Sequence, residues 1–222
     1  MRYVRTTDTS PATLFALLML RAIGRLHPDA TKGVPQCTLA INVRPALHAP
    51  LACQTLASAV YLSLMPEMKD LDIEMQQTMF RGMTILQSND DNMAEKFWQS
   101  TSAFDQLDQI PSSKTRHEVF VGALERRQSQ SCFVSYVGKA NFGAAERYVR
   151  MLYTECVAPF PFGAEISAVG GTFCISLMQR LQTDVYLDAF LDELRGLGLD
   201  YHIDSRHPLQ VAPIVDFRQS HS

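Results

Sequence analysis

The sequence predicts an α/β fold, a two-layer sandwich in which a mixed β-sheet is covered on one face by helices. The first observation is a set of short, apolar, β-prone runs, which begin near Cys37, Leu56, Cys132, Ala164 and Thr172. The second is that helical patterns separate most of these runs, and such alternation favours layered architectures over bundles. A helix bundle is the main competing fold, because the long centre of the chain has the pattern of consecutive helices.

Length and composition are those of a globular protein. The chain has 222 residues, 46% of them hydrophobic and 19% charged, which suffices for a sizeable core. We expect a single domain over residues 1–222, with its core at 10–201 and a polar tail at 207–222. The net charge of −3 does not give the basic surface of nucleic-acid-binding proteins, nor a reason to expect an anionic membrane as partner.

The first predicted element is a buried helix from Pro11 to Gly24, with Ser10 as its N-cap. Its apolar run is shorter than the ~20 residues that a membrane span needs. The run also lacks the cleavage site of a signal peptide, and Asp8 interrupts the basic region that precedes one. We therefore expect a core helix and no membrane span.

Two strands and three helices are expected next. The runs Cys37–Val43 and Leu56–Leu64 are predicted strands, each closed by a following proline. A helical pattern from Asp70 carries an apolar row that we assign to the core rather than to a ligand surface, namely Leu71, Met75, Met79 and Met83. The polar cluster 88–92 predicts a turn or N-cap before a second helix, and a third helix is expected from Pro111.

The last third of the chain returns to strands. Cys132–Val137 is predicted to be a buried strand, and the Gly170-Gly171 pair between runs 164–169 and 172–178 predicts a hairpin. A helix capped by Asp184 follows and is stopped by Gly196 and Gly198. Between strand and hairpin, Gly143 is expected to open a helix with one side formed by Ala145, Tyr148, Val149 and Leu152.

The cysteines indicate a reduced protein. There are five of them, an odd number, with no C-x-x-C pair and no histidine at metal-ligand spacing: Cys37, Cys53, Cys132, Cys156 and Cys174. We interpret them as structural thiols, most of them buried, in a reducing compartment, so we expect a cytoplasmic protein without a metal site.

Catalytic motifs are not evident in the residues themselves. The chain has no G-x-S-x-G, Walker loop, H-E-x-x-H or G-x-G-x-x-G. Among the six histidines we single out His202, because strand alternation would place it on one face with Asp204. We favour a solvated edge over a catalytic role for this pair, and we predict no catalytic residue.

Several segments, taken in order, carry a family resemblance: 21–28, 41–45 (Ile-Asn-Val-Arg-Pro), 133–139 (Phe-Val-Ser-Tyr-Val-Gly-Lys), 165–173 and 184–190. Together they resemble the C-terminal half of the superfamily that includes chloramphenicol acetyltransferase, peptide-synthetase condensation domains and bacterial alcohol acetyltransferases. The resemblance spans Ser10 to Tyr201 and implies a chloramphenicol acetyltransferase-like half-domain.

This resemblance implies acyl transfer from a CoA or carrier-protein thioester, as co-substrate, to an alcohol or amine, with no bound cofactor. In the family the base is the histidine of an H-H-x-x-x-D motif in the N-terminal half, and here no histidine has an aspartate four residues on. The chain therefore resembles a fragment of such an enzyme, inactive alone. The expected partners are an N-terminal half-domain or further copies of the chain, and a small-molecule acceptor.

The resemblance also suggests residues of a substrate tunnel or subdomain interface: Asn42, Arg44, Ser135 and Tyr136. The matching arginine of relatives pairs with the motif aspartate across the half-domain boundary, so Arg44 is expected to be unpaired or solvated. An arginine in an exposed strand-end turn is an equally good interpretation. Ser135 and Tyr136 are expected to be polar groups that line the acceptor channel.

A function of another class stays open. The chain could be a non-catalytic binding or assembly module that dimerises or docks a partner through its exposed half-domain face. A large apolar patch bordering Arg44 and Ser135 would favour the half-enzyme, whereas an evolved module should have covered it. Fold similarity alone does not choose between the two.

Overall fold

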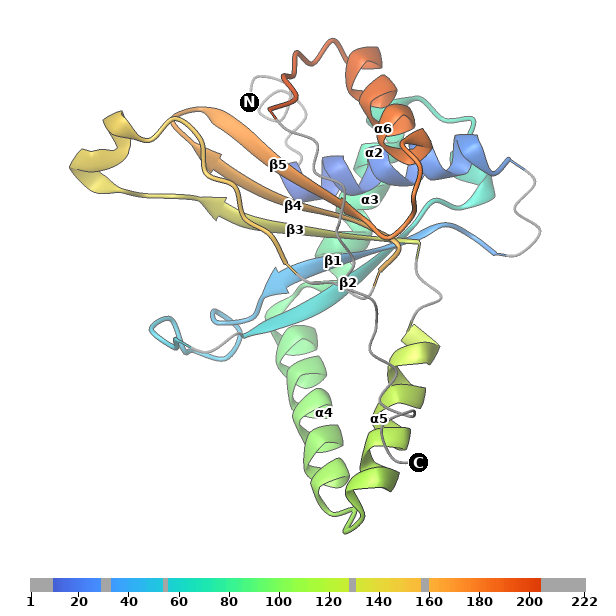
Figure 1. The fold of residues 1–222 in the computed structure, drawn as a ribbon, viewed down its shortest axis with the longest axis vertical. Coiled ribbons are helices and arrows are strands. Elements are labelled where there is room, and N and C mark those ends of the chain that lie inside the picture. The colour runs from blue at the N-terminus through green and yellow to red at the C-terminus, as the bar shows by residue number, and fades with distance from the viewer. Residues whose placement is uncertain (1–9, 29–32, 54–55, 128–130, 157–159, 205–222) are drawn as a thin grey trace, which may run out of the picture.

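The computed structural model describes residues 10–28, 33–53, 56–127, 131–156 and 160–204. Five strands form one sheet in the order β2-β1-β3-β4-β5 (Figure 1). Their bounds are Gln36–Asn42 (β1), Ala57–Ser63 (β2), Cys132–Lys139 (β3), Phe162–Val169 (β4) and Thr172–Gln179 (β5). All five predicted strands are present, and the predicted α/β fold with a mixed sheet is confirmed.

The pairing of the strands explains the mixture. Strands β1, β3 and β4 run parallel, whereas β2 and β5 pair antiparallel with their neighbours at the two edges. Strands β4 and β5 form the predicted hairpin, in which Val169 pairs with Thr172. Gly170 and Gly171 both have positive φ, 55° and 90°, as the two central residues of this tight turn require.

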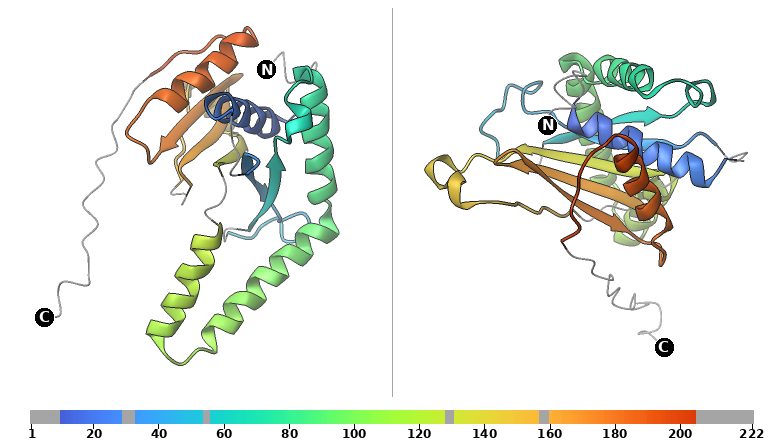
Figure 2. Two further views of the ribbon diagram at one scale, coloured as in Figure 1. Left: turned by 90° about the vertical axis from the view of Figure 1, so that its right-hand side faces the viewer. Right: turned by 90° about the horizontal axis from the view of Figure 1, so that it is seen from above.

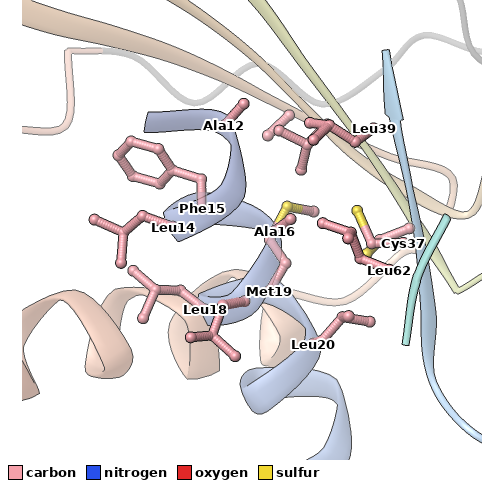
Figure 3. Packing of buried hydrophobic residues seen from close by; sticks show 14 of the residues in the cluster. Ala12, Leu14, Phe15, Ala16, Leu18, Met19, Leu20, Cys37, Leu39 and Leu62 are labelled. Carbon is pink, nitrogen blue, oxygen red and sulfur yellow. The ribbon is translucent and has the colours of Figure 1, made fainter. Parts of the chain in front are cut away.

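Three helices cover one face of the sheet: α2 (Pro11–Leu26), α3 (Ile73–Gln87) and α6 (Val185–Gly196). Figure 1 shows α2 and α6 together above the sheet, and Figure 2 shows the same layer from above. Helix α2 lies at the centre of the core, and its side chains reach Cys37, Leu39 and Leu62 of β1 and β2 (Figure 3). Ser10 caps α2 as predicted, because its Oγ accepts a hydrogen bond from Thr13 N at 3.1 Å.

Two further helices project on the other side of the sheet. Helix α4 (Asp90–Asp108) continues from α3, and α5 (Ser113–Arg127) returns toward β3, so that the pair forms a hairpin below the sheet in Figure 1. Asn89 is the N-cap of α4, since its Oδ1 accepts from Asn92 N at 2.9 Å. The predicted turn at 88–92 is therefore an N-cap, and the helical centre is an insertion into a sheet fold rather than a bundle.

A polar cluster links α2, α3 and α6. Arg21 Nε donates to Glu193 Oε2 at 2.7 Å, and Arg21 Nη1 donates to Gln76 Oε1, also at 2.7 Å. Gln76 Nε2 in turn donates to the carbonyl of Met68 at 2.6 Å. Gln76 and Glu193 are buried, and these bonds satisfy polar groups that would otherwise be costly inside the helical layer.

The prediction that the methionine row of α3 faces the core is wrong for Met75 and Met79, whereas Met83 does pack against the core. Met75 and Met79 have 49% and 40% of their surface exposed, whereas Phe80 and the two glutamines Gln76 and Gln77 are buried. The polar cluster explains this orientation, because Gln76 finds partners inside the molecule. Hydrophobicity alone therefore selected the wrong side of the helix.

The predicted helix after Gly143 is also wrong. Only a short 3-10 helix forms, η2 (Gly143–Tyr148), and the following residues up to Cys156 have no helical or strand structure. Leu152 explains the difference, since its N–H donates to Cys174 Sγ at 3.4 Å and its carbonyl accepts from Ser167 Oγ. Side chains of β4 and β5 thus bind backbone groups that an α-helix would have used internally.

The end of the described chain lies beyond α6. Gly198 has a φ of 65° where the helix stops, as predicted. Residues 202–204 do not form a strand, so the expectation that alternation aligns His202 with Asp204 is not met, and both residues are exposed. The predicted polar tail lies outside the described residues.

The described residues also bear on whether a helix spans a membrane and on the state of the cysteines. None of its helices is long and apolar enough to cross a membrane. The five cysteines are free; Cys37, Cys132 and Cys174 are buried, Cys156 is half-buried and Cys53 is exposed.

Candidate functional site on the second face of the sheet

Strand alternation divides the sheet into a core face and a second face. Phe162, Ala164 and Ile166 of β4 belong to the core cluster under the helices. Because successive side chains of a strand point to opposite sides, Glu165 and Ser167 belong to the face away from α2 and α6, which we call the second face.

Glu165 and Ser135 form a polar pair on this second face. They are directly paired residues of β4 and β3, and Ser135 Oγ donates to Glu165 Oε1 with 3.5 Å between the oxygens. Glu165 is only 7% exposed, and its Oε2 is buried without a hydrogen-bond partner in the described part of the chain. A buried carboxyl with one unsatisfied oxygen is unusual, because such groups are normally fully hydrogen-bonded.

Burial determines the acid–base properties of this pair. It raises the pKa of the Glu165 carboxyl, the hydrogen bond from Ser135 lowers it, and the charge of Glu155 raises it. Burial also raises the pKa of the Cys156 thiol, and the nearby charge of Glu165 raises it further. The second face therefore holds a carboxyl biased toward its neutral form and a thiol biased against the thiolate.

A β-bulge lies beside the pair. The pairing of β3 with β4 shifts between Tyr136 and Gly138, which leaves Val137 without a partner on β4 and 52% exposed. Gly138 has a φ of 94°, a conformation that favours glycine over residues with a side chain. Such bulges re-aim side chains and are frequent next to functional sites.

Asn42 and Arg44 lie at the carboxyl end of β1 and bind each other. Asn42 Oδ1 accepts from the backbone N and from Nη1 of Arg44, both at 3.1 Å, and Arg44 Nε donates to the carbonyl of Ala52 at 3.0 Å. The expectation that Arg44 is unpaired or solvated is met only in part: it is not unpaired, because the arginine folds back onto its own loop, but it is still partly exposed. The structure favours the alternative interpretation, a strand-end turn.

Ser135 and Tyr136 do not share a surface. Tyr136 packs against the core cluster, with its ring edge-to-face on Phe173 at a centroid distance of 6.3 Å. Only Ser135 lies on the second face. Of the four suggested residues, Asn42 and Ser135 lie on the second face by strand alternation. Tyr136 belongs to the core.

Glu165 is the site residue that the sequence analysis did not select. It occurs in the segment Phe-Gly-Ala-Glu-Ile-Ser-Ala-Val, whose eight residues are all buried in the structure. A single carboxylate in the middle of an apolar strand was the available signal. Its partner Ser135 lies 30 positions earlier, so the pair itself is a product of the parallel β3–β4 register.

Neither a metal site nor the pocket between the covering helices belongs to the second face in the described part of the chain. No group of three or more His, Cys, Asp and Glu side chains suited to a metal ion occurs among the described residues. A pocket of about 380 Å³ lies between α2, α3 and α6, with Arg21, Asp72 and Glu193 in its lining. It belongs to the polar cluster that joins these helices and contains none of the suggested site residues.

Comparison with known proteins yields solved structures of similar outline. No protein-family model matches the chain, and no curated protein matches it. The chain is similar to the crystal structure of the epimerization domain from the third module of tyrocidine synthetase B, with a TM-score of 0.49 and 13% sequence identity. The match covers 88% of this chain and 42% of that one, so the chain spans less than half the length of that domain.

Proposed function

We propose that this chain is one half of a thioester-dependent acyltransferase, in which the second face of the sheet forms one wall of the acceptor channel. The Ser135–Glu165 pair is the observation that carries this proposal. A buried carboxyl and a half-buried hydroxyl, placed on the face away from the core and beside a β-bulge, are features of a site rather than of a stabilising core.

The positions of the family-like segments support the proposal. Segment 41–45 ends β1 and segment 133–139 forms β3, and these strands are parallel neighbours. Carboxyl ends of parallel strands meet at one edge of a sheet, which is where open α/β sheets bind ligands. The parallel pairing brings together residues that are far apart in the sequence, such as Leu39 and Val134.

The chemistry of acyl transfer assigns limited roles to these residues. A base must take the proton of the alcohol or amine, and a hydrogen-bond donor must stabilise the carbonyl oxygen of the thioester. Glu165 and Ser135 are polar groups that could form hydrogen bonds with the acceptor and orient it. Since the H-H-x-x-x-D motif is not in this sequence, the histidine base would come from a second lobe.

Binding of a simple thioester tests whether the second face forms a wall of the acceptor channel. With acetyl-CoA as probe, we expect backbone amide NMR shifts that concentrate around Ser135, Gly138 and Glu165. Ser135→Ala should weaken this binding, whereas Tyr136→Phe, a hydroxyl deletion at the next residue but on the core face, should not. Shifts confined to other elements, or equal effects of the two variants, would contradict the proposed wall.

Turnover tests the other part of the proposal, the missing base. Purified chain alone should release CoA from acetyl-CoA, with a panel of simple alcohols and amines, no faster than buffer does. General acid–base catalysis contributes about 10²–10⁴-fold, which binding residues do not replace. Sustained CoA release at an enzymatic rate would show that the chain is not a half-enzyme.

A further inference from the structure

Helix α3 is apolar on two opposite sides. Its inner side carries Phe80, which is completely buried in the core. Its outer side carries Met75, Met79 and Leu86, which are 49%, 40% and 73% exposed. The outward side of a surface helix is normally polar, and a helix that is apolar on both sides is normally covered on both.

The exposed residues form one continuous stripe. With about 100° of rotation per residue, six positions fall within an arc of about 120°. They are Met75, Thr78, Met79, Gly82, Ile85 and Leu86, and none of them is charged. We call this set the α3 stripe. Figure 2 shows α3 along one margin of the molecule, where a partner can approach it.

The α3 stripe is complementary to itself. When two copies of α3 lie antiparallel, one register places Met75 opposite Gly82 of the second copy, and Thr78 opposite Met79. In the same register Ile85 and Leu86 lie beside the residues that precede the helix of the second copy, Asp72 and Leu71. Gly82 has open space around it, since a Cβ added there would meet nothing within 4 Å. The large Met75 side chain therefore faces the smallest residue of the stripe.

Charges on the border of the stripe favour the same arrangement. Glu74 and Arg81 lie next to the α3 stripe, on the same one of its two long sides. A twofold antiparallel contact keeps this border on the same side in both copies. Glu74 then lies two residues, or about 3 Å along the axis, from Arg81 of the second copy. Opposite charges thus meet twice across the contact.

We propose that the protein forms a homodimer through antiparallel packing of α3 on α3, with the α3 stripe as its apolar centre. The contact is isologous, as in most twofold dimers, because the same patch serves both copies. It does not involve the Ser135–Glu165 pair, so it does not depend on acyl transfer. The contact uses no residue of the second face.

Sedimentation velocity of the full chain over micromolar to millimolar concentrations tests the proposal. The wild type should form a concentration-dependent dimer. Met79→Glu places two unpaired carboxylates in the apolar centre, so it should raise the dimer dissociation constant by about 100-fold or more. Met79 is exposed in the single chain, so circular dichroism of this variant should show an intact fold.

Matched variants separate this contact from other exposed apolar surfaces. Phe104→Glu on α4 alters a side chain that is 57% exposed but lies outside the stripe, so its dimer should be unaffected. Glu74→Lys and Arg81→Glu should each weaken the dimer, and the double variant should recover it because the charges are only exchanged. A monomer at every concentration overturns the proposal, as does a dimer that Met79→Glu spares or a charge exchange that recovers nothing.

Discussion

Ser135 on β3 donates a hydrogen bond to Glu165 on β4, across two strands that lie parallel and in register. The contact joins the residue that sequence similarity selected to one that it did not. The pair is therefore the natural place to test whether the second face of the sheet is a site. It also makes the stability of the protein depend on pH in a defined direction.

Replacing Glu165 with Gln should change stability in a pH-dependent manner. The pKa of Glu165 is raised in the folded state. Its favourable contribution is complete below the unfolded-state pKa of about 4.3, and it is lost as the pH rises through the folded-state pKa. Glutamine cannot ionise, so the free energy of unfolding of Glu165→Gln should rise relative to wild type between pH 4 and pH 8.

Urea unfolding at several pH values in this range measures that difference. Each unit by which a pKa is raised corresponds to about 1.4 kcal/mol. Glu155→Gln is the control, because Glu155 is exposed and only its charge acts on Glu165. A difference between Glu165→Gln and wild type that stays constant with pH would show that the carboxyl is not held neutral by burial.

Glu193 should be important for the docking of α2 on α6. Its Oε2 accepts from Arg21 at 2.7 Å and its Oε1 lies 3.4 Å from Arg25 Nη1. Glu193→Ala leaves the half-buried Arg21 without this partner, and we expect a loss of about 2–4 kcal/mol in the free energy of unfolding. Asp192→Ala, which removes an exposed partner of Arg195, should lose less than about 1 kcal/mol in the same measurement.

The two sides of α3 should respond oppositely to truncation. Phe80→Ala should destabilise the single chain by about 3–5 kcal/mol, because it leaves a cavity in the core. Met79→Ala, at the next residue but on the exposed side, should change the stability by no more than about 0.5 kcal/mol. Thermal unfolding at concentrations below dimer formation would compare them, and similar losses would mean that α3 is rotated.

Gln87 protects the free edge of the sheet. Its Oε1 accepts from Tyr61 N at 3.0 Å and its Nε2 donates to Tyr61 O at 2.8 Å, so the side chain replaces a neighbouring strand. Gln87→Glu cannot donate, and its charge faces a carbonyl. We expect a loss of about 1–2 kcal/mol and faster amide hydrogen exchange at Tyr61. Unchanged exchange would mean that other groups protect this edge.

Local signals in the sequence located most elements. Ser10 before Pro11 placed the start of α2, Asn89 in a polar cluster placed that of α4, and the Gly170-Gly171 pair placed the hairpin. These features act within a few residues, through capping and turn geometry, so they do not require a knowledge of the fold. The apolar runs likewise located all five strands.

Contacts between distant residues account for the predictions that were wrong. Met75 and Met79 on α3 face outward because Gln76 finds Arg21 and Met68 inside the molecule. Residues after Tyr148 are not helical because Ser167 and Cys174 bind the backbone of Leu152. Hydrophobic periodicity within one segment cannot predict these partners, because each of them lies on another element of the fold.

The sequence by itself determined the mixed sheet, its helices and the family resemblance of its segments, because short-range patterns suffice for these. Only the tertiary structure paired Ser135 with Glu165, turned Tyr136 into the core and folded Arg44 onto its own loop. The physical reason is the same in each case. Which side of a strand is covered, and which polar groups meet there, depends on the register of parallel neighbours that are far apart in the chain.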